Sequence, residues 1–157
     1  AAKYINKQHP DWEFRIFGEI YKKNPSNLTL DQLNTLIENT NIKYYGHVDN
    51  INDYLIQSKV FCLPSYSEGL PKATIEACAA GCAIVTTDVP GCRDSIEHEV
   101  HGFIVPVKCV SSLIKSIKTL IISEDLRLNF SLNSRKLAEQ EYCIKKITRK
   151  LIRFIGG

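Results

Sequence analysis

The sequence predicts an α/β fold in which a parallel β-sheet is covered by helices on both faces. Strand-like and helix-like segments alternate along the 157 residues with short connections, and this alternation requires the crossovers that make strands parallel. The segment 59–63 is nearly all apolar, as in a strand covered on both faces. With 44% hydrophobic and 24% charged residues, the composition is that of an ordinary globular domain.

Three strands and their connecting helices are expected in the first half of the chain. The chain reads as helical from its start, and strands are predicted at residues 13–18, 41–46 and 59–63, each followed or ended by Gly or Pro. A short helix is predicted at residues 50–58. Another helix follows residues 25–27, and its apolar positions recur with a helical period at Leu30, Leu33, Leu36 and Ile37.

The second half continues the alternation. A helix is predicted at residues 71–80, with Pro71 at its first position, and strands are predicted at residues 83–86 and 103–105. Two helices follow, the first with an apolar stripe from Val110 to Ile121, the second with Leu126, Phe130 and Leu137.

Ligands bind beyond the carboxyl ends of parallel strands. The loops after residues 18, 46, 63 and 86 are therefore expected along one edge of the sheet.

Charge and composition exclude several classes of protein. A net charge of +3 is too small to indicate a nucleic-acid partner, and no apolar run reaches the ~18 residues of a membrane helix. The six cysteines form no Cys-x-x-Cys pair and have no zinc-site spacing. We interpret them as free thiols in a reducing cytoplasm.

The segment after the strand at 59–63 carries the chemistry. Residues 64–81 read PSYSEGLPKATIEACAAG. A helix start offers free N–H groups and the positive end of a dipole to an anion, and Gly69 lets a ligand approach the backbone closely. The pattern predicts a phosphate pocket whose first free N–H groups belong to Lys72, Ala73 and Thr74.

Two carboxylates, Glu68 and Glu76, accompany this phosphate pocket. They fit an anion that belongs to a nucleotide sugar, because carboxylates accept charge-assisted hydrogen bonds from sugar hydroxyls while the backbone holds the diphosphate. The plainer alternatives are that Glu68 only complements the helix dipole and that Glu76 is a solvated helix residue.

These motifs resemble the retaining family-4 glycosyltransferases, which have the two-domain GT-B fold. The likeness lies in two Glu with seven residues between them, set in Pro-Ser-x-x-Glu-Gly-x-Pro and followed by Glu-Ala-x-Ala-Ala-Gly. It extends to residues 83–91 (AIVTTDVPG), 101–106 (HGFIVP) and 42–48 (IKYYGHV). It covers nearly the whole chain and implies a Rossmann-like, donor-binding C-terminal domain over residues 1–157.

The resemblance implies a role for each matching residue. Glu68 would contact the donor sugar near the reacting carbon and Glu76 would bind the ribose hydroxyls. Backbone N–H groups of Gly69 and Leu70 would hold the sugar or diphosphate. Thr74 and Ile75 at the helix start would face the phosphate. The loop bordering the base would consist of Gly46, His47 and Val48.

The implied reaction transfers a glycosyl group from a nucleotide diphosphate sugar to a saccharide or lipid-linked saccharide, in bacterial polysaccharide biosynthesis. UDP is favoured over GDP as the nucleotide, no cofactor is expected, and the sequence demands no metal. His47 is interpreted as a loop residue with a catalytic base as the alternative, and His98 and His101 as surface turn residues. Asp94 stands where the family often has Glu, and it could instead cap a helix.

The sequence departs from the family at two places. Where the family shows Gly-x-Gly, this chain has Gly18, Glu19 and Ile20. The family's diphosphate-binding Arg and Lys, its first strand and its N-terminal acceptor domain are all expected upstream of residue 1. We therefore expect this chain alone to transfer no sugar, because catalysis by positioning needs both reactants to be held.

Three rival functions are considered. A non-catalytic nucleotide-sugar binding module could use the same fold. A dinucleotide-dependent oxidoreductase requires a Gly-x-Gly-x-x-Gly that this sequence lacks. A glycosidase with paired carboxylates fits less well, because both Glu lie in one strand-loop-helix unit aimed at a phosphate.

Residues 144–157 form a basic amphipathic stretch. It is expected either to pack as a helix on its own protein or to lie against anionic lipid at the cytoplasmic membrane face.

Overall fold

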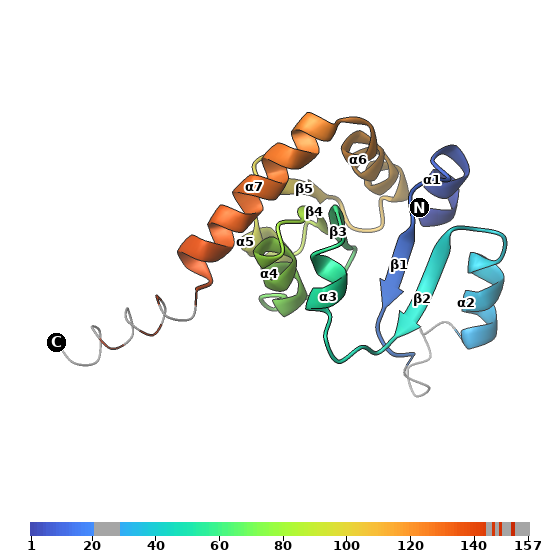
Figure 1. The fold of residues 1–157 in the computed structure, drawn as a ribbon, viewed down its shortest axis with the longest axis horizontal. Helices are drawn as coiled ribbons and strands as arrows, with labels where there is room; N and C mark the ends of the chain where they lie inside the picture. The colour runs from blue at the N-terminus through green and yellow to red at the C-terminus, as the bar shows by residue number, and fades with distance from the viewer. Residues whose placement is uncertain (21–28, 144–145, 147, 149–151, 153–157) are drawn as a thin grey trace. The chain divides into compact units, whose positions relative to one another are not determined.

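The computed structural model describes residues 1–20, 29–143, 146, 148 and 152. The chain divides into two compact units, Ala1–Ile51 and Asn52–Gly157, and each is described by itself (Figure 1). The start predicted for a helix at residues 25–27, and most of the basic stretch 144–157, lie outside the described residues.

The first unit holds two parallel strands and two helices. Its elements are α1 (Ala2–Gln8), β1 (Phe14–Phe17), α2 (Leu30–Ile37) and β2 (Ile42–Gly46). The two strands pair with Phe14 opposite Ile42. Helix α2 begins after Thr29, whose hydroxyl accepts the Gln32 N–H while the Gln32 side chain accepts the Thr29 N–H.

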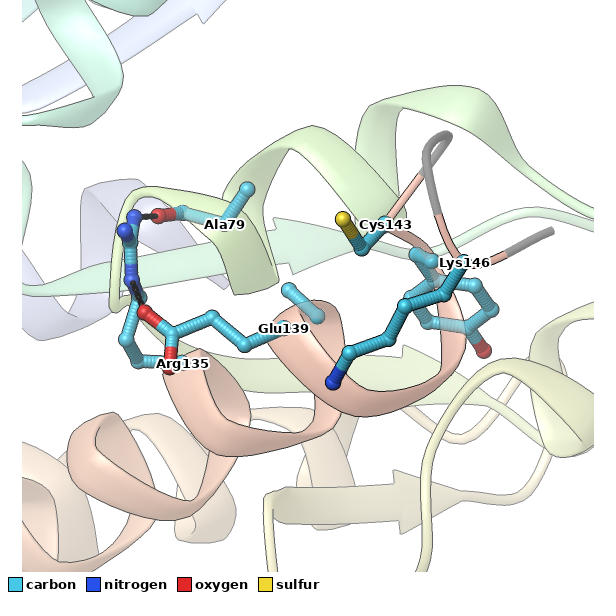
Figure 2. Close-up of a pocket in the computed structure, with 7 residues that line it drawn as sticks. Ala79, Arg135, Glu139, Cys143 and Lys146 are labelled. Carbon is cyan, nitrogen blue, oxygen red and sulfur yellow. Dashed lines mark hydrogen bonds and ion pairs between the residues drawn. The ribbon is translucent and has the colours of Figure 1, made fainter. Parts of the chain in front are cut away.

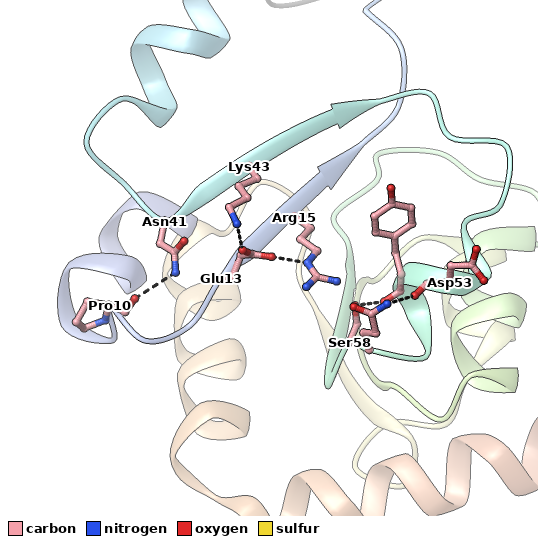
Figure 3. A network of polar contacts seen from close by, with 9 residues as sticks. Pro10, Glu13, Arg15, Asn41, Lys43, Asp53 and Ser58 are labelled. Atoms are coloured by element: carbon pink, nitrogen blue, oxygen red, sulfur yellow. Dashed lines mark hydrogen bonds and ion pairs between the residues drawn. The ribbon is translucent and has the colours of Figure 1, made fainter.

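A polar cluster joins β1 to β2 (Figure 3). The Glu13 carboxylate accepts a hydrogen bond from Arg15 Nε at 2.5 Å and pairs with the Lys43 ammonium of the neighbouring strand. These two cations hold the pKa of Glu13 below its ordinary value. Asn41, just before β2, donates to the Pro10 carbonyl at 3.3 Å. The first unit is thus tied together by polar contacts as well as by its strand pairing.

The second unit is a three-stranded parallel sheet with flanking helices. The order of its strands is β3-β4-β5. Its elements are α3 (Asn52–Leu55), β3 (Val60–Leu63), α4 (Lys72–Ala79), β4 (Ala83–Thr87), α5 (Pro90–Ser95), β5 (Gly102–Val105), α6 (Val110–Ile122) and α7 (Glu124–Glu141).

The strands predicted from the sequence are confirmed, and their pairing within each unit is parallel. β1 pairs with β2 in the first unit, and β3, β4 and β5 form one sheet in the second. Alternation of strand and helix requires parallel crossovers, but it does not determine which strands become neighbours. Within the second unit, β3 pairs with β4, and all four of its residues are half-buried.

Helix α5 is an element that the sequence analysis did not predict. It begins after Val89, with Pro90 in its first turn. Asp94 lies in the last turn of this helix, so it is not the helix cap that was considered. The predicted helix at 50–58 is shorter in the structure, because α3 covers Asn52–Leu55 alone.

The core of the second unit surrounds β4. All five residues of that strand are buried, and α4, α5, α6 and α7 contact it. From α7, Phe130 is 1% exposed and its ring meets Phe103 of β5 edge-on, with the ring centroids 5.3 Å apart. From α4, Ala77 and Cys78 are fully buried. The central strand therefore sets the position of the elements around it.

All six cysteines are free thiols, as expected. Burial raises the pKa of Cys78 to about 11 and that of Cys82 to about 12, so these two thiols stay protonated. Cys109, which precedes α6, differs because hydrogen bonds with Ser111 and Ser112 lower its pKa to about 7. Among the helices of the described residues, none has the length and apolarity needed to cross a membrane.

One histidine expected at the surface is buried. His101 is 9% exposed, and its Nδ1 accepts the backbone N–H of Glu97 at 3.0 Å. Burial lowers the pKa of His101, because the charged imidazolium loses hydration. The residue closes the turn before β5, and the neutral ring is the form that the fold accommodates.

Removing the Phe130 ring should weaken the second unit selectively. Phe130→Ala leaves a cavity next to Phe103 and is expected to lower the free energy of unfolding by about 3 to 5 kcal/mol. Leu128→Ala, on the same helix at a site 53% exposed, is the control and should change it by about 0.5 kcal/mol or less. Urea denaturation followed by circular dichroism measures both, and equal losses would contradict this account of the core.

His101 should make stability depend on pH. The pKa of His101 is lower in the folded state than its ordinary value of 6.5. The neutral His101 side chain therefore contributes to stability above pH 6.5, and this contribution is lost as the pH falls through the folded-state pKa. Between about pH 7.5 and about pH 5.5, the free energy of unfolding should fall more steeply for the native chain than for His101→Gln. Denaturation series across this range test the prediction, and parallel curves would refute it.

Candidate functional site

A loop between β3 and α4 presents Glu68. The loop starts where β3 ends at Leu63 and finishes at Pro71, the N-cap of α4. Within it, the Ser65 hydroxyl lies 2.8 Å from Glu68 Oε1 and donates a hydrogen bond to it. Glu68 is half-buried while Gly69 and Leu70 are exposed. The carboxylate therefore has a defined position at the carboxyl end of a strand, where the sequence analysis expected the site.

The end of β4 holds the first half of this loop. The Thr86 hydroxyl donates to the Leu63 carbonyl at 3.0 Å, and the Thr87 hydroxyl donates to the Ser65 carbonyl. Both threonines are buried. Because the acceptors are backbone groups, the two contacts fix the path of the chain as it leaves β3. Sequence reasoning missed this role, although two threonines ending an apolar strand are a readable signal.

The second half of the loop rests on Gly91, at the start of α5. A Cβ built on Gly91 would lie 1.2 Å from the Gly69 carbonyl oxygen and 2.5 Å from that of Glu68. No side chain fits there. A Cβ on Gly69, by contrast, would meet nothing within 4 Å. The sequence predicts a close approach of a ligand at Gly69. The structure adds a second requirement for glycine at position 91, where the backbone of α5 meets that of residues 68 and 69.

The start of α4 offers a smaller set of free amides than the sequence suggested. The N–H groups of Thr74 and Ile75 donate to the Pro71 carbonyl at 3.0 and 3.3 Å. Thr74 therefore does not contribute a free amide, which corrects that expectation. No hydrogen bond from the Lys72 or Ala73 amide to the described backbone is present. Those two amides point to the anion-binding position of a helix N-terminus.

A buried hydroxyl lies within the same helix turn. Thr74 is fully buried, and its Oγ1 has no hydrogen-bond partner in the part of the chain that the structure describes. A buried hydroxyl without a partner costs about 1 to 3 kcal/mol. The first turn of α4 thus retains unused hydrogen-bonding capacity on the side chain of Thr74 as well as on the backbone.

Glu76 lies on α4, one turn beyond Lys72. The Lys72 ammonium lies 3.3 Å from Glu76 Oε1, and the lysine side chain is 88% exposed. A pair with lysine on the N-terminal side and this much exposure contributes about 0.5 kcal/mol or less to stability. The Glu76 carboxylate is therefore held loosely and stays available to a ligand.

The predicted base-side loop belongs to the first unit. Gly46 ends β2 with a φ of +66°, and its carbonyl accepts the Gly18 N–H at 2.8 Å. His47 is exposed, with Nε2 3.8 Å from Asp49 Oδ1, and Val48 is half-buried. The structure brings residues 65–76 together with residues 86–91 in the second unit. The grouping of Gly46, His47 and Val48 with them stays a prediction.

An open groove of about 430 Å³ lies at the other end of α4, between that helix and α7 (Figure 2). The Arg135 guanidinium donates to the Ala79 carbonyl at the end of α4 and, through Nε, to Glu139 at 2.7 Å. This contact anchors the C-terminal end of α4 to α7. The N-terminus, at the opposite end of α4, directly follows the loop that carries Glu68.

The described residues contain no group of three or more His, Cys, Asp or Glu side chains placed to hold a metal ion. The site offers hydrogen-bond donors in its backbone amides and hydrogen-bond acceptors in two carboxylates, one held and one loosely held. Amides at a helix start suit phosphate, and carboxylates suit sugar hydroxyls. Chemically, the arrangement can bind a polyhydroxylated molecule that carries phosphate.

Comparison with known proteins agrees with this chemistry. The family described as Glycosyl transferases group 1 matches residues 1–137. The chain is 36% identical over 118 residues to N,N'-diacetylbacillosaminyl-diphospho-undecaprenol alpha-1,3-N-acetylgalactosaminyltransferase of Campylobacter jejuni, covering 75% of this chain. It is 30% identical over 116 residues to the capsular polysaccharide biosynthesis glycosyltransferase CapM of Staphylococcus aureus, covering 74% of this chain. It spans 30% of the length of each relative.

Solved structures show the same fold. The crystal structure of HepE from Anabaena in complex with UDP superposes with a TM-score of 0.84 over 94% of this chain and 41% of that one. The sequence identity is 19%, so the likeness concerns the fold. The Rossmann-like α/β architecture expected from the motifs is confirmed.

Proposed function

The chain belongs to the group 1 glycosyl transferases, and from this premise we propose that it is the donor-binding domain of a retaining glycosyltransferase. The enzyme would take a hexosyl group from a nucleotide diphosphate sugar and transfer it to a saccharide or lipid-linked saccharide. The observation that carries the proposal is that a held Glu68 carboxylate precedes the start of α4, where the Lys72 and Ala73 amides have no partner in the described backbone.

Each part of the site has a role in this proposal. The Lys72 and Ala73 amides and the α4 dipole would hold the diphosphate, while Gly69 and Leu70 would lie against it or the sugar. Glu68 would accept hydrogen bonds from donor-sugar hydroxyls beside the reacting carbon. Glu76, whose only ion pair in the described part of the chain is the weak one with Lys72, would bind the ribose hydroxyls.

The proposed glycosyl transfer requires no oxidant or reductant. The bond from the anomeric carbon to the diphosphate oxygen breaks, and a bond to the acceptor oxygen forms on the same face of the sugar. The nucleotide diphosphate leaves with the electron pair and takes up the proton that the acceptor hydroxyl loses. The first turn of α4 would stabilise the charge that develops on the leaving group. We propose no cofactor and no covalent enzyme nucleophile.

We propose UDP rather than GDP as the nucleotide. The Anabaena protein of the same fold was solved in complex with UDP. The loop Gly46, His47 and Val48 would then border the uracil base. Because the likeness to that protein concerns the fold, the choice between nucleotides rests on direct measurement of donor use.

The acceptor and the pathway are proposed from the relatives. The Campylobacter jejuni protein is named for a diphospho-undecaprenol-linked acceptor, and the Staphylococcus aureus protein for capsular polysaccharide biosynthesis. We propose a saccharide or lipid-linked acceptor in bacterial polysaccharide biosynthesis, bound by an N-terminal domain of the same protein. Because this chain spans 30% of those relatives, we also propose that it transfers no sugar by itself.

A donor panel tests the proposed activity. The complete gene product, supplied with UDP-sugars and GDP-sugars and a lipid-linked saccharide, should form a glycoside that mass spectrometry detects, with the donor's anomeric configuration by NMR. Glu68→Gln should lower kcat by about 100-fold, since it removes charge beside the reacting carbon. Glu76→Ala should weaken UDP binding by about 10-fold in calorimetry.

Glu97→Ala is the matched control for charge, because it removes an exposed carboxylate of the same unit outside the site. It should leave UDP affinity and kcat within about twofold. UDP binding without turnover by the complete gene product would favour the non-catalytic module. Intact UDP affinity in Glu76→Ala would overturn the ribose assignment, and transfer by the 157-residue chain would overturn its proposed inactivity.

The basic stretch 144–157 is proposed to contact anionic lipid. A lipid-linked acceptor would place the reaction at a membrane surface. Flotation with vesicles containing phosphatidylglycerol should carry the native chain upward, and truncation after residue 143 should abolish this. Equal flotation of both chains would support the alternative, in which the stretch packs on its own protein.

A further inference from the structure

The loop that carries Glu68 is held by residues that the proposed roles do not include. Its start is fixed by Thr86 and Thr87, its carboxylate by Ser65, and its end by contact with Gly91. The question is whether these contacts serve only the fold or also the reaction. Resting on the proposed function, we propose that Ser65 and Gly91 are positioning residues, which together determine where the Glu68 carboxylate lies.

The Gly91 contact leaves no room for a side chain beside the backbone that carries Glu68. Any Cβ at position 91 would overlap the Gly69 carbonyl oxygen, at 1.2 Å, and would also lie 2.3 Å from the Gly69 carbonyl carbon. Atoms of that size cannot approach so closely, and both neighbours are backbone rather than a side chain that could rotate away. A side chain at 91 therefore has to push residues 68–69 outward.

The surface against which the loop rests is itself fixed. The Asp88 N–H donates to the Val105 carbonyl at 2.8 Å, and the Arg93 N–H donates to the Val89 carbonyl at 2.8 Å. The Asp88 and Arg93 side chains form an ion pair at 2.5 Å. Residues 88–93 are thus tied to β5 and to α5. A Cβ added at 91 would accordingly displace the Glu68 loop more readily than α5.

Ser65 completes the arrangement from within the loop. Its hydroxyl donates to Glu68 Oε1 at 2.8 Å, and its carbonyl accepts from Thr87. One residue therefore links the carboxylate to the end of the central strand β4. Ser67, two residues further on, is exposed; its carbonyl accepts from the Ser65 hydroxyl at 3.2 Å, and its own hydroxyl makes no hydrogen bond to the described part of the chain. Ser65 and Ser67 therefore differ in whether the hydroxyl bonds the Glu68 carboxylate, which is the contact that the proposal depends on.

Position matters because transfer depends on geometry. A misplacement of about 1 Å in a reacting group can cost about 100-fold in rate. The three atoms nearest to a Cβ at position 91 belong to residues 68 and 69, which precede the first turn of α4. A displaced loop should therefore lower turnover much more than UDP affinity, because α4 still holds UDP while Gly69 and Leu70 move with the loop. A general loss of folded protein would instead lower the calorimetric binding stoichiometry in step with the apparent kcat.

The test compares Gly91→Ala, Ser65→Ala, Ser65→Thr and Ser67→Ala in the complete gene product. Gly91→Ala should lower kcat by about 100-fold, and Ser65→Ala by about 10-fold. Ser65→Thr keeps the hydroxyl and should recover most of the kcat. Ser67→Ala, the matched control, should stay within about twofold of the native kcat. UDP affinity by calorimetry should stay within about threefold of native in the three serine variants, and should fall by no more than about tenfold in Gly91→Ala, in which Gly69 and Leu70 move with the loop.

The outcomes separate this proposal from the proposed function. If the native protein neither binds UDP nor transfers sugar, the proposed function fails first. If it does both, and Ser65→Ala matches Ser67→Ala, the positioning role of Ser65 is refuted. Parallel losses of kcat and UDP affinity in Gly91→Ala would show a merely structural role for Gly91. Should Gly91→Ala not fold, the serine comparison still decides whether the Glu68 carboxylate is positioned by its neighbours.

Discussion

The burial of the central strand β4 is the constraint on which the second unit depends. Its residues from Ala83 to Thr86 are fully buried and Thr87 nearly so, with β3 on one side and β5 on the other. A strand in that position can leave no side-chain polar group unsatisfied without cost. The two threonine hydroxyls at its end meet this requirement by bonding the backbone after β3. Satisfying the core therefore also fixes the loop that bears Glu68.

The two carboxylates near the start of α4 are held to different degrees. A helix start favours anions, yet two carboxylates lie near it. The structure treats them differently, since Glu68 is held by Ser65 whereas Glu76 pairs weakly with an exposed lysine. A held carboxylate suits a group that must meet a reacting sugar at one position. A loosely held one suits a ligand that provides its own hydroxyl groups, as a ribose does.

The positions of the strands and of the loop that carries Glu68 could be predicted from the sequence, because both depend on local residue patterns. Alternating apolar segments marked the strands, and the segment from Pro64 to Gly81 identified both the loop and the helix start. His101 and α5 were misjudged for a shared reason. A polar ring next to Gly102 reads as a surface turn, and a Pro-Gly pair reads as a loop. Burial and the packing of a short helix depend on residues distant in the chain.

By itself, the sequence determined the parallel α/β class, the positions of the strands, the family and the two carboxylates flanking a helix start. These follow from periodicity, from turn residues and from a motif whose members lie within 18 residues of one another. Tertiary structure alone decided which strands pair within each unit, that the buried Thr74 hydroxyl has no partner among the described residues, and that Gly91 touches Gly69. Strand pairing and backbone contact are set by which distant segments pack together, and local residue order does not encode that choice.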